Sequence, residues 1–328
     1  MTNSNLRVPS PLIGDSLVMQ RLRDLIEKVA LSNLSIAIQG PTGAGKEVVA
    51  NAIHQASRRT GKFVAFNVSG ISEGLFEDAL FGHIRGGFTN ALADRDGYLM
   101  EAHNGTLFMD EIGQLRLSNQ STLLRAIDMK VFRPVGGKRD KTSDFRIISA
   151  TNEDLPMLSV HGQFRVDLLH RLRSFVITVP PLTQHIEDIP SLTAHLLGQV
   201  FGERREVSVT REAMCRLQEY HWPGNVRELR SVIQAAFYLA NEESITANAV
   251  EMALAAGAGD VLGDFTVHQQ RREVLVKALV RHQHRVESVA TDLGVARATV
   301  YRWLKYYGIP TPERYRPTKL DSGQLLGQ

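Results

Sequence analysis

One glycine-rich turn constrains this chain more than any other stretch of its sequence. Residues 40–47 read GPTGAGKE; they follow the apolar run Leu34–Ile38 and open a periodic, helical stretch, Lys46–Ala56. A strand, a glycine turn that ends in lysine, and a helix form the setting of a phosphate-binding P-loop. The glycines let backbone N–H groups turn toward phosphate oxygens, and the helix N-terminus adds a favourable dipole. The pattern therefore predicts a triphosphate site in an α/β domain.

The turn also indicates how the phosphates and a metal would be held. We expect Lys46 to reach the β- and γ-phosphates of ATP. The next residue is Glu47, where the general pattern has a Ser or Thr whose hydroxyl binds Mg²⁺, so the metal must depend on acids elsewhere. A glycine-rich turn without a ligand is the alternative interpretation. The predicted nucleotide-binding residues of the turn are Gly40, Pro41, Thr42, Gly43, Ala44, Gly45, Lys46 and Glu47.

A pair of adjacent carboxylates supplies the second half of the predicted site. The segment GTLFMDEIG, residues 105–113, reads as an apolar strand that ends in Asp110 and Glu111. Adjacent carboxylates are costly to desolvate unless they meet a cation or water. We expect Asp110 to hold Mg²⁺, directly or through water, and Glu111 to orient or polarise the attacking water. Acids often follow strands, so the pair is informative because a P-loop precedes it.

Strand-length apolar runs and helical stretches alternate over residues 12–180. After Pro180 and Pro181 the pattern is helical over residues 181–254. The alternation predicts a parallel sheet with helices on both faces, and the second region predicts an α-helical subdomain. The runs expected to be strands are Leu34–Ile38, Phe63–Val68, Thr106–Met109 and Phe145–Ser149, and Ser118–Ile127 is one of the expected helices.

The remaining segments divide by composition. Residues 255–264, AAGAGDVLGD, are small and glycine-rich and read as a linker. Helical character resumes over residues 265–310 and stops at Gly308 and Pro310. We expect the N-terminal residues 1–11 and the polar tail 311–328 to be disordered.

The C-terminal helical region carries an excess of positive charge, although the formal net charge of the chain is only +3. Between Phe265 and Lys319 the only acids are Glu273, Glu287, Asp292 and Glu313, and basic residues far outnumber them. Such an excess favours a polyanionic partner over a merely solvated face.

Within this region, RVESVATDLGVARATVYRWLKYYGI, residues 285–309, reads as two helices joined by a tight turn at Gly294. This is the pattern of a helix-turn-helix, although a purely structural hairpin is the alternative. The N-terminal residues of the second helix should read base edges, while Arg302 and Lys305 should hold phosphates. Such modules usually act as dimers, which predicts a palindromic DNA site. The residues predicted to contact DNA are Arg297, Thr299, Tyr301, Arg302 and Lys305.

Three absences in the sequence bear on the compartment. The N-terminus, MTNSNLRVPS, lacks a basic stretch followed by an apolar one, so no signal peptide is indicated. No run reaches the roughly 20 apolar residues that span a bilayer. The single cysteine, Cys215, permits no internal disulfide. We expect a cytoplasmic protein without a membrane span.

These motifs, together with the string YHWPGNVREL that ends at Leu229, resemble the AAA+ ATPases that activate sigma-54, the bacterial enhancer-binding proteins. The likeness runs from about Ile13 to Arg230 and resumes in the C-terminal helices. It implies an AAA+ P-loop sheet, an α-helical lid and a Fis-type helix-turn-helix. It also implies ATP hydrolysis with Mg²⁺, a homo-oligomeric ring expected to be hexameric, an upstream activating or enhancer site on DNA, and contact with the sigma-54 RNA polymerase holoenzyme.

The resemblance assigns further residues to the nucleotide. Asn67 matches the switch asparagine, which senses the γ-phosphate through the residue at Glu111; a structural asparagine is the alternative. Thr151 and Asn152, in SATNED, match the sensor I position, although a helix cap would explain them too. Arg227 matches the sensor II arginine.

Two arginines match the arginine fingers of the family. Arg165 and Arg171 lie in FRVDLLHRL. A guanidinium supplied across a subunit boundary neutralises charge that develops on the γ-phosphate. The fingers imply that the active form is a ring, in which each subunit completes its neighbour's site; two surface arginines are the alternative.

The loop that contacts the sigma factor in the family has the pattern GAFTGA, and this chain has GGFTNA, from Gly86 to Ala91. Phe88 and Thr89, the contacting pair, are retained. Asn90 replaces a glycine; asparagine tolerates positive φ better than other residues, but it adds bulk. Phe88 is expected to reach a partner, with burial in its own domain as the alternative.

Three functions are compatible with these features. The first is an activator that uses ATP hydrolysis to remodel sigma-54 polymerase. The second is a DNA-binding regulator that uses nucleotide to control oligomerisation and does not engage sigma-54. The third, a P-loop enzyme of another class, leaves the WPGN–VREL string unexplained. The sequence begins at the ATPase region, so we expect control by expression level or by a regulatory protein in trans.

Overall fold

The computed structural model describes residues 12–88, 91–201, 207–240 and 244–257, and scattered positions of the C-terminal helices at 275, 278, 279, 281, 282, 285–292, 297, 300, 301, 304 and 309. The chain divides into two compact units, Met1–Leu254 and Ala255–Gln328, and each is described by itself. The segments 1–11 and 311–328 and most of the expected linker lie outside the described residues. Among the described helices, none has the length and apolar character needed to cross a membrane.

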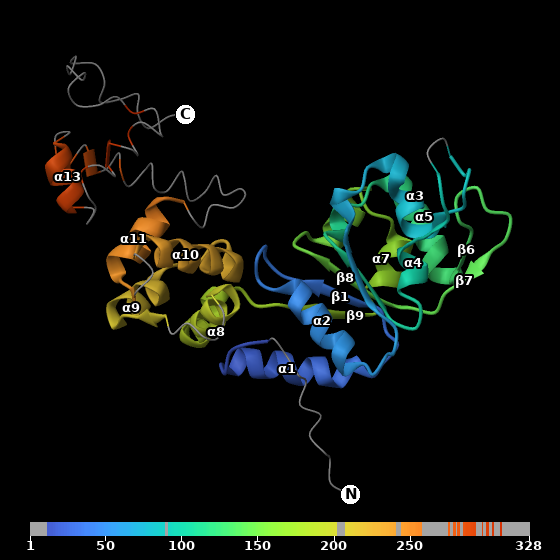
Figure 1. The fold of residues 1–328 in the computed structure, drawn as a ribbon, viewed down its shortest axis with the longest axis horizontal. Helices are drawn as coiled ribbons and strands as arrows, with labels where there is room; N and C mark the ends of the chain where they lie inside the picture. Colours follow the sequence, from blue (N-terminus) through green and yellow to red (C-terminus); the bar gives the residue numbers. More distant parts are fainter. Residues whose placement is uncertain are drawn as a thin grey trace, which may run out of the picture. The chain divides into compact units, whose positions relative to one another are not determined.

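A five-stranded parallel sheet forms the centre of the first unit, with the strand order β2-β5-β8-β1-β9 (Figure 1). The predicted parallel sheet is thus confirmed. Every residue of β8 is buried, as expected for a strand covered on both faces. The strands are β1 (Ile36–Gln39), β2 (Phe63–Asn67), β5 (Thr106–Asp110), β8 (Arg146–Thr151) and β9 (Phe175–Thr178).

Helices cover both faces of this sheet. Adjacent strand residues point to opposite layers: Phe108 packs with the helices α1 and α2, while Leu107 packs with the helices of the other face. Figure 1 shows α1 and α2 on one side and α3, α5 and α7 on the other. The first layer comprises α1 (Leu17–Ala30) and α2 (Lys46–Ala56), and the second comprises α3 (Phe76–Phe81), α4 (Tyr98–Glu101), α5 (Leu117–Met129), α6 (Leu155–Val160) and α7 (Val166–Leu172).

A buried arginine joins α1 to the sheet. Arg146 of β8 is 2% exposed, and its guanidinium donates hydrogen bonds to the carbonyls of Val29, Ala30 and Leu34. The carbonyls at the end of α1 lack helical partners and carry the negative end of the helix dipole, so a cation suits this position. Burial lowers the pKa of Arg146 to about 10.

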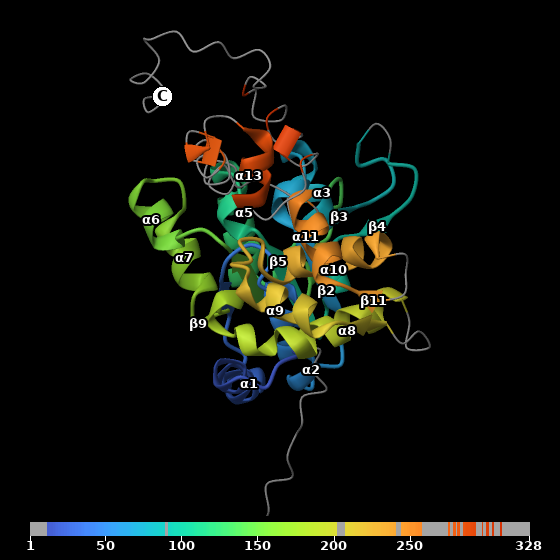
Figure 2. The ribbon, with the colours of Figure 1, turned by 90° about the vertical axis from the view of Figure 1, so that its left-hand side faces the viewer.

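A helical subdomain follows the sheet within the same unit, and Figure 2 shows its helices grouped together. Trp222 is buried there, and its indole N–H donates to the carbonyl of Leu217 at 2.7 Å. A short parallel pair of strands, absent from the helical prediction for this region, joins two of the connections. The elements are α8 (Ile189–Phe201), β10 (Ser208–Val209), α9 (Arg211–Glu219), α10 (Asn225–Leu239), β11 (Ser244–Ile245) and α11 (Ala247–Ala255).

Two antiparallel strand pairs extend from the sheet layer. The first joins β3 (Gly82–His83) to β4 (Arg95–Asp96), and the second joins β6 (Val131–Phe132) to β7 (Lys141–Thr142). A backbone bridge from His83 to Val135 connects the pairs. The expected sigma-contacting loop lies between β3 and β4.

The second unit is described only in part. Its helix α13 (Val286–Asp292) contributes to a buried apolar cluster. The members of this cluster are Leu275, Ala278, Leu279, Val286, Val289, Ala290, Val300 and Leu304.

Candidate functional site

The predicted P-loop connects β1 to α2 at the carboxyl edge of the sheet. Gly43 has φ +76° and Gly45 has φ +96°, a left-handed conformation that L side chains rarely adopt. Gly43 also has no room for a side chain, because a Cβ there would lie 2.1 Å from the carbonyl oxygen of Gly224. Gly45 is the N-cap of α2, so the turn leads directly into a helix N-terminus that favours anions.

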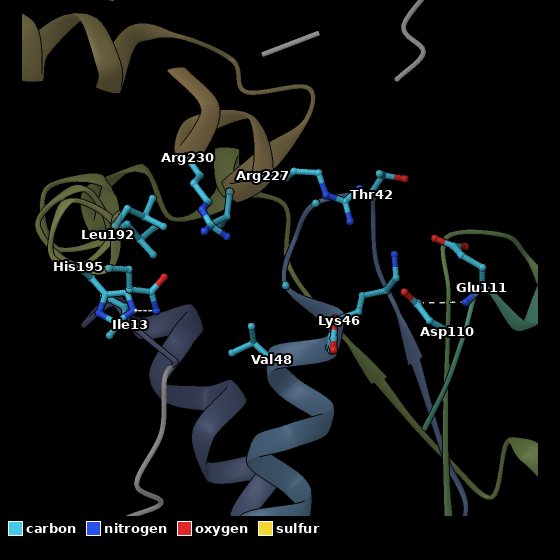
Figure 3. Close-up of a pocket in the computed structure, with 16 residues that line it drawn as sticks. Ile13, Thr42, Lys46, Val48, Asp110, Glu111, Leu192, His195, Arg227 and Arg230 are labelled. Atoms are coloured by element: carbon cyan, nitrogen blue, oxygen red, sulfur yellow. Dashed lines mark hydrogen bonds between the residues drawn. The ribbon is translucent and has the colours of Figure 1, made fainter. Parts of the chain in front are cut away.

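Lys46 lies over this turn. Its side chain is largely buried, and its ammonium donates to the carbonyl oxygens of Gly40 at 3.1 Å and Pro41 at 3.4 Å. Burial lowers the pKa of Lys46, and the nearby carboxylates of Glu111 and Asp110 partly oppose that shift. Figure 3 shows the lysine between the turn and the acid pair. The sequence prediction of a lysine and two acids at one site therefore has the required geometry.

The two acids differ in their surroundings. The Asp110 carboxylate accepts a hydrogen bond from the backbone N–H of Glu111 at 3.0 Å. Glu111 has φ +54° in the left-handed region, and its buried Oε2 has no hydrogen-bond partner among the described residues. Burial raises the pKa of Glu111, while Lys46 acts in the opposite direction. A strained, partly desolvated carboxyl without a fixed partner is suited to accept a proton from a reactant.

The sensor residues predicted by resemblance also lie at the carboxyl edge. Asn67 pairs in register with Asp110, but its amide oxygen accepts hydrogen bonds from the N–H and the hydroxyl of Ser69. Asn152 donates from its amide to the Thr42 hydroxyl at 3.3 Å. Thr151 is buried, and its backbone carbonyl accepts the N–H of Gly40 at 3.4 Å, so both residues of the sensor pair contact the P-loop.

The WPGN turn couples the helical subdomain to the P-loop. Asn225 is 2% exposed and has φ +52°. Its amide N–H₂ donates to the carbonyl of Thr42 at 2.9 Å, and its amide oxygen accepts from the N–H of Leu182 at 2.9 Å. The backbone N–H of Arg227 donates to the carbonyl of Gly43 at 3.3 Å. These hydrogen bonds fix the first turn of α10 against the P-loop, so that its side chains face the turn that holds Lys46.

Together these parts enclose one cavity of about 300 Å³. One end is polar and contains Lys46, Asp110, Glu111 and the P-loop, and Arg227 and Arg230 enter from α10 (Figure 3). The opposite end has an apolar wall that sequence reasoning did not identify. The wall comprises Ile13, Val48, Leu192, Leu196 and Val226, with the hydrogen-bonded pair His195 and Gln199 beside it.

The two predicted finger arginines do not line this cavity. Arg165 pairs with Asp167, with a 2.7 Å distance between Nη2 and Oδ2, and Arg171 pairs with Asp128, with 2.9 Å between Nε and Oδ1. Both side chains are close to half exposed. They are therefore available at the surface rather than committed to the pocket of their own chain.

The loop of the GGFTNA string begins in a tight turn. The N–H of Gly86 donates to the carbonyl of Ala91 at 2.9 Å. Phe88 is 41% exposed, and its ring meets the His83 ring edge-on, with centroids 4.9 Å apart. Phe88 is thus neither buried nor fully extended into solvent. The predicted contact residue Thr89, and Asn90, lie outside the described residues.

The predicted DNA-contacting residues fall mostly outside the described part of the second unit, namely Thr299, Arg302 and Lys305. Arg297 is exposed and forms an ion pair of 2.7 Å with Glu287 of α13. Tyr301 is half-buried against the apolar cluster, so only part of its side chain is accessible.

Comparison with known proteins agrees with this geometry. Residues 12–178 match the family model of the sigma-54 interaction domain, and residues 183–261 match that of the AAA+ ATPase lid domain. The chain is 43% identical over 227 residues to the transcriptional regulator VasH of Vibrio cholerae, which covers 68% of this chain and 43% of VasH. It is 40% identical over 299 residues to the transcriptional regulatory protein GlrR of Escherichia coli, which covers 89% of this chain and 67% of GlrR. This chain therefore spans less than half the length of VasH and about two thirds of GlrR.

Comparison with solved structures also finds a similar fold. The crystal structure of NtrX from Brucella abortus in complex with ATP superposes with a TM-score of 0.68 and 34% identity. The match covers 92% of this chain and 70% of the NtrX chain.

Proposed function

Because this chain belongs to the family of sigma-54-dependent transcriptional regulators with an AAA+ ATPase domain, we propose that it hydrolyses ATP in the Lys46 pocket to activate transcription by sigma-54 polymerase. The observation that supports this most is the convergence of Lys46, Asp110, Glu111 and Arg227 on one cavity. A triphosphate needs such a set of cations and backbone N–H groups beside metal-binding acids. The apolar wall opposite them suits an adenine base.

The residues divide the reaction between them. Lys46 exchanges its bonds to the Gly40 and Pro41 carbonyls for phosphate oxygens, and Arg227 adds a second positive charge. The carboxylate of Asp110 fits a Mg²⁺ ligand, because its Oδ2 remains for a cation while Oδ1 accepts the Glu111 N–H. Mg²⁺ would neutralise charge on the phosphates. Glu111 takes the proton from the attacking water as the new P–O bond forms and the bond between the β- and γ-phosphates breaks, which releases ADP and phosphate.

Asn67 and Asn152 sense the γ-phosphate in this proposal. Asn67 lies beside Asp110 in register, so exchange of its bonds to Ser69 would bring its amide toward the acid pair. Asn152 already reaches the Thr42 hydroxyl. Replacement of either amide by Ala should leave ATP affinity within a few-fold of the original but lower turnover.

We further propose that Arg165 and Arg171 complete the site of a neighbouring subunit in a hexameric ring. Their exposed positions outside their own cavity support this. A mixing experiment tests it: R165A and K46A should each be inactive alone, but a mixture should recover part of the ATPase activity. In the mixture some boundaries combine an intact Lys46 pocket with an intact Arg165. A mixture as inactive as its components would contradict shared sites.

Lys46 also tests the separation of functions. K46A should abolish ATP turnover but leave DNA binding intact, with the exposed helix residue Lys28, replaced by Ala, as the matched control. The DNA-binding residues that we propose are Arg297, Thr299, Tyr301, Arg302 and Lys305, in a Fis-type helix-turn-helix that binds an upstream site as a dimer. Loss of DNA binding in K46A would show that the two activities are not separable.

The GGFTNA loop is proposed to carry the sigma-54 contact through Phe88 and Thr89. The partial exposure of Phe88 supports this. Binding to the sigma-54 holoenzyme in the presence of a transition-state analogue of ATP hydrolysis is the direct test, with F88A as the negative variant. Promoter binding and ATP turnover would both take place in the cytoplasm, which is the compartment that we propose.

A second function is favoured by one observation, the packing of Phe88 against His83 in a loop that departs from GAFTGA. In this alternative the chain binds DNA and uses nucleotide to control oligomerisation without sigma-54 contact. Normal ATPase activity without a holoenzyme complex would support it. Gain of activation in N90G would show that the altered loop is the cause.

A further inference from the structure

The buried carboxylate of Asp188 joins two chain segments that each contribute residues to the cavity. Asp188 ends the 3₁₀ turn Ile186–Asp188 directly before α8, and it is 2% exposed. Its Oδ1 accepts the backbone N–H groups of Asp15 at 2.8 Å and Ser16 at 2.9 Å. Its Oδ2 accepts the Ser16 hydroxyl at 2.6 Å. Three donors from one chain segment thus surround a carboxylate from another segment more than 170 residues away.

The local backbone is shaped to receive this carboxylate. Gly14 has φ +119°, and a Cβ at that position would lie 2.4 Å from Asp188 Oδ2. Ser16 is also the N-cap of α1, since its hydroxyl oxygen accepts the N–H of Met19. The donors are therefore fixed by a glycine-specific turn on one side and a helix start on the other, so Asp188 meets a rigid partner.

No basic side chain neutralises Asp188 in this arrangement among the described residues. The nearest titratable ring is that of His185, whose Nδ1 lies 3.3 Å from Oδ2 without hydrogen-bond geometry. Burial lowers the pKa of His185, although the neighbouring Asp188 carboxylate opposes that shift. The three hydrogen bonds are then the main compensation for the buried charge, and loss of any one of them is costly.

Both segments that meet at Asp188 continue into the cavity. Ile13, directly before Gly14, lines the apolar end together with Leu192 and Leu196 from the first turns of α8. Lys46 and the acid Glu111 of the polar end come from other elements. The contact at Asp188 therefore sets the position of Ile13 relative to α8 at the apolar end without touching the polar end.

We propose that Asp188 is a positioning residue, which holds Ile13 against α8 so that the apolar end of the cavity is preformed for the nucleotide base. This rests on the proposed function, because it assumes that the cavity binds ATP. A carboxylate suits this position because its two oxygens accept three donors at once. Asp188 therefore contributes to the affinity for the nucleotide base and not to the rate of the chemical step.

The test compares D188A, D188N and a matched helix-cap variant. D188A should raise the KM for ATP about tenfold, the factor expected for loss of a hydrogen bond to a charged group, while kcat stays within about twofold. D188N should recover most of the affinity, because its amide oxygen can still accept the two backbone N–H groups. T210A removes the N-cap of α9 in the same subdomain, away from the cavity, and should leave KM unchanged.

A competition measurement separates positioning from general loss of structure. Inorganic tripolyphosphate carries the phosphates without a base, so its inhibition constant, obtained by displacement of a fluorescent ATP analogue and corrected for the affinity of that analogue, should be the same for the original protein and for D188A. An unchanged KM in D188A, or equal loss of ATP and tripolyphosphate affinity, would overturn the inference. If D188A does not fold, S16A removes the hydroxyl donor, and with it the N-cap of α1, but keeps the two backbone donors to Asp188. It should show a smaller, ATP-selective loss, and no such loss overturns the inference as well.

Amide exchange distinguishes this inference from the proposed function. In the nucleotide-free protein the amides of Asp15 and Ser16 should exchange faster in D188N than in the original chain, and faster still in D188A. Protection at these amides in a protein that does not bind ATP would mean that the proposed function fails while the Asp188 contact stands. Equal exchange in all three proteins would mean that the contact itself is absent.

Discussion

Replacement of Asn225 tests how the helical subdomain is joined to the P-loop. This residue combines a left-handed backbone, φ +52°, with two side-chain hydrogen bonds to distant residues, from the Leu182 N–H and to the Thr42 carbonyl. In N225A the left-handed conformation costs about 1–2 kcal/mol. The Leu182 N–H, buried without an acceptor, costs about 1–3 kcal/mol more. The free energy of unfolding should therefore fall by about 2–5 kcal/mol, a large fraction of the stability of a typical domain.

Two further variants separate these contributions. N225G removes both hydrogen bonds but adopts positive φ without strain, so it should lose only the hydrogen-bond part, about 1–3 kcal/mol. N225D keeps an acceptor for Leu182 N–H but places a carboxylate against the Thr42 carbonyl, and should raise the KM for ATP more than it lowers stability. The exposed Asn248 of α11, replaced by Ala, is the control and should change stability by less than about 0.5 kcal/mol.

Urea unfolding followed by tryptophan fluorescence provides the measurement. Trp222, buried and three residues before Asn225, reports on this region, and W303F removes the other tryptophan of the chain from the signal. If N225G were as stable as the original protein, the bridging hydrogen bonds would contribute nothing. If N225A and N225G were equal, the argument from backbone strain would be wrong.

Three further outcomes follow from groups described above. E111Q should lower ATP turnover at least about 100-fold yet raise the melting temperature at neutral pH. Because burial raises the pKa of Glu111, the carboxyl stabilises the fold below the unfolded value of 4.5, and this contribution is lost as pH rises through the folded pKa. Calorimetry should therefore show that the gain in melting temperature of E111Q vanishes below pH 4.5. Burial, with Arg59 and Arg146 nearby, lowers the pKa of His54, so as pH falls the unfolded chain binds a proton at this residue before the folded chain does. The free energy of unfolding should therefore fall as pH drops below 6.5, and its pH profile should be flatter in H54Q. R146M removes the guanidinium donors from the carbonyls of Val29, Ala30 and Leu34 and should cost about 2 kcal/mol in urea unfolding. A more stable variant would show that desolvation of the guanidinium outweighs its hydrogen bonds.

The polar end of the site could be predicted because its chemistry is encoded locally. Phosphate binding needs glycines and a lysine in one turn, so GPTGAGK specifies both the ligand and the strand and helix around it. The predicted helix Lys46–Ala56 agrees with α2, and the strand runs lie within two residues of β1, β2, β5 and β8. The strands β1, β5 and β8 are buried on both faces, and the apolar runs that this burial favours made them recognisable in the sequence.

The apolar end could not be predicted for the opposite reason. Leu192 and Leu196 follow a helical period that looks the same whether the side chains face a core or a cavity. Ile13 and Asp188 come together only through tertiary contacts between distant segments. The strand β9 is four residues long and lacks a flanking motif, and the two-residue pairs β10–β11 and β6–β7 carry too few positions for a period-2 pattern.

The loop that carries Phe88 is interlocked with the turn between β6 and β7. A Cβ on Gly136 would lie 2.4 Å from the Cα of Gly87, and a Cβ on Gly87 would lie 2.6 Å from the Val135 carbonyl oxygen. The N–H of Ile84 also donates to that carbonyl. The two backbones are in direct contact, so Phe88 cannot advance unless Val135 moves with it or the hydrogen bond from Ile84 to Val135 breaks. The base of the loop is therefore stiffened by a second backbone, and a push at Phe88 is transmitted to both strand pairs.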